Sequence, residues 1–190
     1  AILKYLQKEL PRPSLHGHQV WHSGGMLMEY LQTIDLPCKP RFIEIGCGWG
    51  LTGIFCAKFL AGDVLLTDAD ERVLPYAKVH SALNQVTLST AQASFDCLTN
   101  EQLCHRDVLI GSDICFWPEM RKQLQSLIGR AFDSGVQKVV MADPGRAPFL
   151  QLANFAKRRY SADLISWKTS SSKHGGYLLV ANNPDLALTA

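Results

Sequence analysis

Long apolar runs, a strong net charge and internal repeats are all missing from this 190-residue sequence. No apolar run approaches the roughly 20 residues that a bilayer span requires, which argues against a membrane protein. Lysine and arginine outnumber the acids only 19 to 17, and a net charge of +2 is too small to indicate binding to nucleic acid or to a membrane surface. Residues 1–10 carry two lysines and a glutamate, unlike a signal peptide, so we expect a cytoplasmic protein.

Cysteine pairs with metal-binding spacing are also missing. The six cysteines form no Cys-x-x-Cys pair and several fall within apolar segments, so we expect reduced, mostly buried thiols: Cys38, Cys47, Cys56, Cys97, Cys104 and Cys115. Three neighbouring histidines lack an acid or cysteine that would complete a metal site: His16, His18 and His22. A zinc set made of Cys97, Cys104 and His105 is a weaker candidate still, and we expect no bound metal.

Short apolar runs alternate with segments of helical spacing along the whole chain, which predicts an α/β fold. The expected strands are residues 42–45, 63–70, 86–94, 108–111 and 138–142, followed by a hairpin of 164–169 and 176–181. Helices are expected over residues 1–10, 20–31, from Leu51, up to Leu83 with Pro75 in its first turn, from Pro118, and over 149–160. The pattern predicts one domain with an open, mainly parallel sheet, helices on both faces, and a ligand across the carboxyl edge of the strands.

A glycine-rich turn follows the first of these strands. Gly46, Gly48 and Gly50 let the backbone turn sharply and let a ligand approach it, and the next helix points its free N–H groups at that ligand. Glu44, one residue before the strand ends, suits an ammonium or sulfonium ligand better than a phosphate. The segment from Gly48 to Gly53 also fits the dinucleotide pattern G-x-G-x-x-G, so a nicotinamide binder is an alternative. In either case Asp68, 20 residues after Gly48, is expected to hold a ribose.

The wider pattern Glu44-x-Gly46-x-Gly48-x-Gly50 resembles the first motif of the class I, seven-β-strand S-adenosylmethionine-dependent methyltransferases. Trp21, followed by small residues and an amphipathic helix, is similar to the protein-lysine methyltransferase branch of that family. Asp113-x-x-Phe116 resembles the Asp-x-x-Tyr motif of the same branch, with the tyrosine hydroxyl missing. Asp143-Pro144-Gly145-Arg146 looks like the group that modifies lysines of the electron-transfer flavoprotein β subunit, although the tetrapeptide could equally be only a turn.

The resemblance implies a Rossmann-like methyltransferase sheet, parallel with a C-terminal antiparallel hairpin. It implies one domain over residues 1–190, with 1–35 as an N-terminal helical cover and 41–181 as the catalytic core. The implied cofactor is S-adenosyl-L-methionine, released as S-adenosyl-L-homocysteine. Its implied binding residues are Trp21, Glu44, Gly46, Cys47, Gly48, Gly50, Asp68, Ala69, Asp96 and Ser112. Asp113, as an acceptor that orients the amine, and Phe116 are the implied catalytic residues.

Two of these assignments have open alternatives. Asp70 is expected to cap the next helical turn, but it could exchange roles with Asp68. Asp96 lies where related enzymes place an acid near the adenine amine, and a solvated loop carboxylate is nearly as good a reading.

The implied activity is methyl transfer to a lysine amine of a protein substrate. The alternatives are a methyltransferase for a small molecule or another protein residue, and an inactive cofactor-binding module. Only the short segment 11–25 could form a lid, and an open cleft suits a macromolecular substrate. RNA is disfavoured, because no basic stripe with interleaved aromatics and no Asn-Pro-Pro-Tyr-like motif are present. The basic residues 157–159 are expected to form a solvated face or a docking patch for an acidic partner. We expect the protein to be a monomer.

Overall fold

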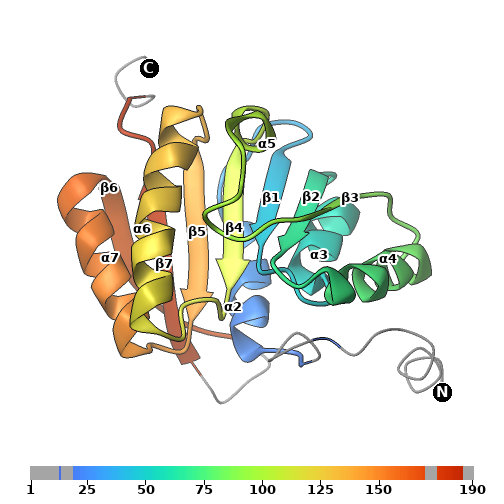
Figure 1. Ribbon diagram of the computed structural model, residues 1–190, viewed down its shortest axis with the longest axis horizontal. Helices are drawn as coiled ribbons and strands as arrows, with labels where there is room; N and C mark the ends of the chain where they lie inside the picture. Colours follow the sequence, from blue (N-terminus) through green and yellow to red (C-terminus); the bar gives the residue numbers. More distant parts are fainter. Residues whose placement is uncertain (1–12, 14–18, 170–174, 186–190) are drawn as a thin grey trace.

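A computed structural model describes residue 13 and residues 19–169 and 175–185 (Figure 1). The helix predicted over residues 1–10 lies outside the described residues, as do His16 and His18. Within the described part, no helix is long and apolar enough to cross a bilayer.

A seven-stranded sheet forms the centre of the molecule, in the order β3-β2-β1-β4-β5-β7-β6. Neighbouring strands are parallel except at β7, which runs antiparallel to both β5 and β6. The strands are β1 Arg41–Ile45, β2 Asp63–Asp68, β3 Ser89–Gln92, β4 Val108–Ser112, β5 Lys138–Asp143, β6 Ser161–Lys168 and β7 Gly175–Asn182. The predicted parallel sheet with a closing antiparallel hairpin is confirmed.

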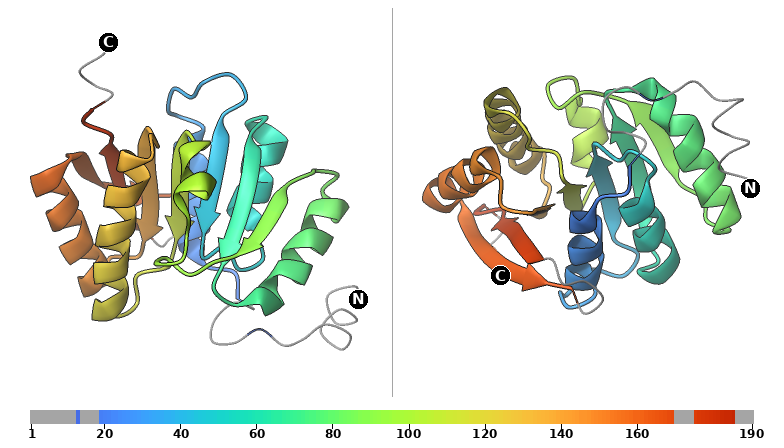
Figure 2. Two further views of the ribbon diagram at one scale, coloured as in Figure 1. Left: turned by 45° about the horizontal axis from the view of Figure 1, so that its top comes forward. Right: turned by 90° about the horizontal axis from the view of Figure 1, so that it is seen from below.

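Helices cover both faces of the sheet, as the two further views show (Figure 2). One apolar cluster joins α2, α3 and α4 to strand side chains such as Phe42 and Leu66. The other joins α5, α6 and α7 to the opposite face through side chains such as Ile43 and Leu109. The helices are α2 His22–Leu31, α3 Leu51–Phe59, the 3-10 turn η1 Glu71–Val73, α4 Leu74–Leu83, α5 Asn100–Cys104, α6 Pro118–Asp133 and α7 Ala147–Arg159.

The alternation of side chains explains this two-layer burial. Along β1, Phe42 contributes to one cluster while Ile43 and Ile45 contribute to the other, as the period of two in a strand requires. The central strands β1 and β4 are apolar on both faces, which is typical of parallel strands covered by helices on each side.

The order of the strands reverses between β1 and β4. The chain leaves β1 toward β2 on one side, and β4 and β5 lie on the other side. In open α/β sheets a ligand binds in the crevice at this point, outside the carboxyl ends of the strands. The fold therefore places the glycine-rich turn after β1 beside Ser112 and Asp113 at the end of β4.

Three details differ from the sequence-based expectations. β3 is shorter than predicted, although it is an edge strand as expected. Helix α5 was not predicted. The sequence feature that marks its start is a capping box, in which the side chains of Thr99 and Gln102 accept hydrogen bonds from each other's backbone N–H groups. The expectation of mostly buried thiols is wrong for half of the cysteines. Cys47, Cys56 and Cys115 are buried within the apolar layers, whereas Cys38, Cys97 and Cys104 lie in loops or at a helix end and are exposed.

Candidate active site at the carboxyl edge of the sheet

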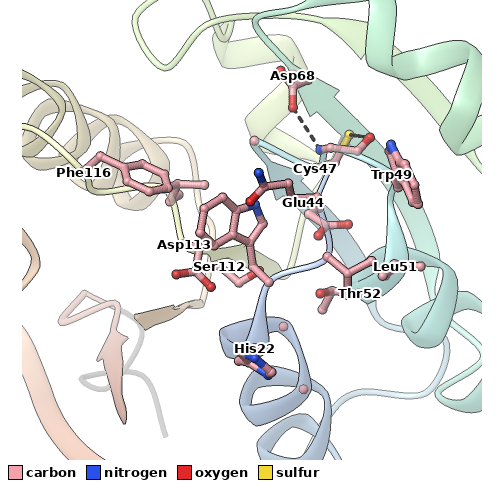
Figure 3. Close-up of a pocket in the computed structure, with 18 of the residues that line it drawn as sticks. His22, Glu44, Cys47, Trp49, Leu51, Thr52, Asp68, Ser112, Asp113 and Phe116 are labelled. Carbon is pink, nitrogen blue, oxygen red and sulfur yellow. Dashed lines mark hydrogen bonds between the residues drawn. The ribbon is translucent and has the colours of Figure 1, made fainter. Parts of the chain in front are cut away.

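A cleft of about 590 Å³ opens at the carboxyl ends of β1, β2 and β4. Its walls come from the glycine-rich turn, the first turns of α2 and α3, the loop at 94–95, and the segment that follows β4. Figure 3 shows Asp113 and Phe116 on one side of this cleft and Asp68 and Trp49 on the other. The strand order therefore brings together residues that are far apart in the sequence.

The glycine-rich turn has a backbone that other residues would adopt only under strain. Gly46, Gly48 and Gly50 all have left-handed φ values, of 60°, 50° and 73°. A Cβ on Gly46 would lie 2.6 Å from the side chain of Ile114, so space as well as conformation requires glycine there. Gly50 caps α3, and the amide end of this helix faces the cleft. The turn is thus shaped for close approach of a ligand to the main chain.

Asp68 is tied to the same turn. Its carboxylate accepts hydrogen bonds from the backbone N–H of Gly48 at 2.9 Å and of Asp70 at 2.9 Å, and it lines the cleft. Burial raises the pKa of Asp68, and the backbone N–H donors oppose that shift. Asp70 instead accepts the N–H of Arg72 and caps η1, as predicted. Of the two acids, the structure therefore brings Asp68 to the cleft.

Glu44 is buried beneath the turn, with only 3% of its surface exposed. Its Oε2 accepts the N–H of Gly53 in α3 at 2.8 Å, and the side chain borders the cleft. Burial raises the pKa of the Glu44 carboxyl to about 8, against the hydrogen bonds from Gly53 and Thr52, which lower it. The acid is held in place by α3 and can present its other oxygen to a ligand.

This buried acid predicts how the stability of the ligand-free protein depends on pH. Because the folded-state pKa of Glu44 lies near 8 and the unfolded value is near 4, the unfolded state ionises first. Stability from this group is complete below about pH 4 and is lost as the pH rises toward 8. We expect Glu44→Gln to melt roughly 5 °C above the wild type at pH 7.5 and to converge with it near pH 4.5, as measured by calorimetry. Parallel melting curves for the two proteins over this range would contradict the assignment.

Asp113, at the end of β4, is the centre of a buried ionic cluster. One oxygen accepts Arg146 Nη1 at 2.8 Å and the other accepts the backbone N–H of Ser23 at 3.2 Å. Arg146 Nη1 also donates to Asp143 Oδ2 at 2.7 Å. Asp113 has a left-handed φ of 55°, a conformation that aspartate tolerates better than most residues and that is enriched at functional sites. The cluster joins β4, β5 and the start of α2.

The tetrapeptide at 143–146 is both a turn and a contributor to this cluster. Asp143 Oδ1 accepts the N–H groups of Gly145 and Arg146 at 2.8 and 2.7 Å, which closes the turn. The same turn aims the Arg146 guanidinium at Asp113. The tetrapeptide is thus a turn, as the sequence allowed, and its contact with a substrate stays a prediction.

Two aromatic rings adjoin the ionic cluster. Trp21 and Phe116 meet edge to face at 5.4 Å between ring centroids, and both line the cleft. The Arg146 guanidinium lies 4.2 Å from the centroid of Phe116 and 5.8 Å from that of Trp21. This wall of the cleft combines aromatic faces with a carboxylate.

Most of the predicted site residues line the cleft. These are Trp21, Glu44, Gly46, Cys47, Gly48, Asp68, Ala69, Ser112, Asp113 and Phe116. Gly50 shapes the turn and is not part of the lining. Asp96 is exposed, and its side chain accepts Gln123 Nε2 at 2.6 Å. Ser94, Phe95 and Gln123 line the cleft in this region instead, and the adenine role of Asp96 stays a prediction.

Comparison with known protein families identifies the chain. Residues 6–148 match the model of a family described as lysine methyltransferase. This match covers well over half of the sequence. The chain belongs to the lysine methyltransferase family. A search of curated proteins found no significant match.

Solved structures of other methyltransferases share the fold of this methyltransferase. One from Pyrococcus furiosus superposes with a TM-score of 0.69 at 18% identity, over 90% of this chain and 87% of that one. Precorrin-6y C5,15-methyltransferase from Geobacter metallireducens gives 0.64 at 11% identity, over 83% and 86%. Magnesium protoporphyrin IX methyltransferase from Synechocystis, with bound S-adenosylhomocysteine, gives 0.62 at 16% identity, over 88% and 83%. At these identities the likeness concerns the fold.

The cofactor of this methyltransferase is S-adenosylmethionine, and the cleft fits it. The glycine cradle leaves the main chain open to a ligand, Asp68 can accept from a ribose, and Glu44 suits the cationic methionine end. Trp49 Nε1 and Thr169 Oγ1, on two lining residues, are buried polar atoms with no hydrogen-bond partner in the described part of the chain. Buried polar atoms of this kind call for a partner, which a ligand would provide.

Several lining residues of this methyltransferase were not predicted from the sequence. Trp49 lies between Gly48 and Gly50 of the glycine-rich turn, and this position in the sequence could have predicted that it lines the cleft. Phe95, Gln123 and Thr169 come from a loop, from α6 and from the end of β6, and no local pattern marks them. Among the described residues no group of three or more histidines, cysteines or acids could hold a metal ion.

Proposed function

We propose that this methyltransferase transfers a methyl group from S-adenosylmethionine to a lysine amine of a protein substrate. The observation that carries the proposal is a wall of the cleft formed by Trp21, Phe116 and Asp113. Figure 3 shows Phe116 and Asp113 of this wall across the cleft from Trp49 of the glycine-rich turn. Aromatic faces beside a carboxylate are suited to an amine on an aliphatic stem. Membership of the lysine methyltransferase family supports the same substrate class.

Bound S-adenosylmethionine supplies a methyl group on a cationic sulfur, and the acceptor lone pair takes this methyl as the carbon–sulfur bond breaks and its electrons remain on sulfur. The protein must align the acceptor and exclude water. A lysine must also lose its proton to solvent, which from a pKa near 10.4 costs about 4.6 kcal/mol at pH 7. Enclosure by Trp21 and Phe116 favours the neutral amine, because burial disfavours the charged form.

Asp113 is proposed to orient this amine. Each of its oxygens accepts one hydrogen bond in the structure, and an ionised carboxylate offers about four acceptor sites, so it can accept another N–H from the substrate. The side chain is only 3% exposed and is held from two sides, which gives that acceptor a fixed position.

Asp113→Asn tests this role. The variant keeps the shape of the side chain but loses its charge, and we expect roughly a 10- to 100-fold fall in kcat with cofactor affinity changed less than about threefold. Steady-state kinetics and calorimetric binding of S-adenosylhomocysteine measure the two quantities. Full turnover by the variant on the physiological substrate would remove Asp113 from the mechanism.

The proposed substrate class is tested with S-adenosylmethionine carrying a tritiated methyl group, the purified protein and a cell lysate. We expect enzyme-dependent label in acid-precipitable, protease-sensitive material, and none with the Asp68→Ala variant. Label confined to the soluble fraction would contradict a protein substrate and favour a small molecule. A lysate from cells lacking the gene supplies substrate that has not already been methylated.

A further inference from the structure

Arg146 does not line the cleft, but it contacts three residues that do. Its Nη1 bonds Asp113, and its guanidinium lies over the rings of Phe116 and Trp21. Asp143, which is fully buried, holds it from behind. We call the wall formed by Trp21, Phe116 and Asp113 the acceptor wall. The protein therefore keeps a cation of its own, Arg146, directly behind the acceptor wall.

We propose that Arg146 is the built-in counter-cation of the acceptor wall, and that it limits the negative charge there so that an amine is bound in its uncharged, nucleophilic form. The inference rests on the proposed function, because an amine must be the acceptor. Without Arg146, the buried carboxylate of Asp113 in this wall and that of Asp143 behind it would both lack their cation. They would hold an ammonium ion strongly and oppose loss of its proton.

The geometry favours a fixed Arg146 over one that the substrate displaces. A single nitrogen, Nη1, bridges both carboxylates at 2.8 and 2.7 Å, and the backbone N–H of Arg146 is itself fixed to Asp143 at 2.7 Å. Burial lowers the pKa of Arg146, but Asp113 and Asp143 together raise it, so the group stays charged. Burial raises the pKa of Asp143, while the backbone N–H groups of Arg146 and Gly145 and the charged Arg146 side chain lower it.

Other ionisable groups lie near this cluster, and the effect of their charges has to be distinguished from that of Arg146. His22 at the start of α2 and Glu44 at the end of β1 border the same cleft. Cys115, after β4, interacts with Asp143, with Arg146 and with Arg121 of α6. Tyr177 of β7 pairs with Asp143 across the sheet.

The test compares two ligands that differ in charge at the acceptor wall. S-adenosylhomocysteine has a neutral sulfur, whereas sinefungin carries a primary amine on a carbon in place of the methyl-bearing sulfur. The ratio of their dissociation constants, measured by calorimetry between pH 6 and pH 10, reports how the wall treats an ammonium ion. It needs no protein substrate.

We expect Arg146→Gln to shift this ratio roughly tenfold in favour of sinefungin at pH 7.5, because one uncompensated charge changes the pKa of a neighbouring amine by about one unit. The shift should shrink as the pH rises through the pKa of the bound amine, because the neutral amine carries no charge for the wall to hold. Arg146→Lys, which keeps a cation, should leave the ratio within about threefold of the wild type. The double variant Asp113→Asn with Arg146→Gln restores the wild-type charge count and should restore the ratio. Arg121→Gln, which removes a cation near Cys115, is the control for a general charge effect.

A ratio in Arg146→Gln within twofold of the wild type, or equal weakening of both ligands at every pH, would overturn the proposal and leave Arg146 a structural residue. Failure of the wild type to bind S-adenosylhomocysteine would instead refute the proposed function. A shifted ratio together with label on a residue other than lysine would retain the counter-cation and reject lysine.

Discussion

Asp68→Ala is expected to weaken binding of S-adenosylhomocysteine by at least about 100-fold, since each hydrogen bond to a charged group contributes about 1.5–3 kcal/mol. One hydrogen bond from Gly48 in the glycine-rich turn and one from Asp70 after β2 end on this carboxylate. The acceptor proposed for the ribose is lost with them. Isothermal titration calorimetry measures the affinity, and circular dichroism checks that the chain remains folded.

The neighbouring acid provides the matched control for this experiment. Asp70 lies two residues away, caps η1 and pairs with the half-exposed Arg72. Because exposed ion pairs contribute little, Asp70→Ala should change the affinity by less than about threefold. An Asp68→Ala protein that binds within tenfold of the wild type would show that the cofactor does not depend on this edge of β2.

Arg146→Met is expected to have the largest effect on stability, a loss of about 2–4 kcal/mol that lowers Tm by roughly 5–15 °C. The methionine fills similar space but leaves Asp113 and Asp143 buried without their cation. Breaking a buried pair from one side is costly because the remaining charge has no partner. Thermal and denaturant unfolding measure the loss.

The double variant Asp113→Asn with Arg146→Met separates charge from packing. Removing one of the two carboxylates relieves part of the imbalance, so the double variant should be more stable than Arg146→Met alone. Arg72→Met, which breaks a surface pair, should cost less than about 1 kcal/mol. Equal stability of Arg146→Met and the wild type would contradict the role of this cluster in holding α2 against β4 and β5.

The sequence predicted the parts of this molecule whose cause is local. β1, β2, β4 and β5 are short apolar runs that end at glycine or an acid, and these runs emerged with bounds close to those expected. The capping role of Asp70 was predicted correctly, because an aspartate directly before a helical turn is a recognisable cap, whereas the ribose role of Asp68 stays a prediction. The carboxyl edge of a parallel sheet then brought the predicted acids together.

What the sequence did not predict depends on contacts across the sheet. Arg146 meets Asp113 because β4 and β5 are neighbours and a left-handed Asp113 turns toward the next loop. Neither fact is visible in the 32 residues between them. Phe95 and Gln123 reach the cleft from a loop and from α6, where only packing decides which side chain points inward. Packing also explains Asp96, which follows the edge strand β3. Its side chain is exposed and does not line the cleft.

Methyl transfer to a lysine amine leaves a methylated lysine in the substrate, so the chemical identity of the labelled residue decides whether lysine is the acceptor. A protein labelled by this enzyme with tritiated S-adenosylmethionine would be isolated, hydrolysed in acid and separated by chromatography against methylated amino-acid standards. We predict that the label co-migrates with mono-, di- or trimethyl-lysine. Label in methyl-arginine or methyl-histidine, or as volatile methanol from an ester, would contradict the lysine assignment while leaving the methyltransferase fold and its cofactor in place.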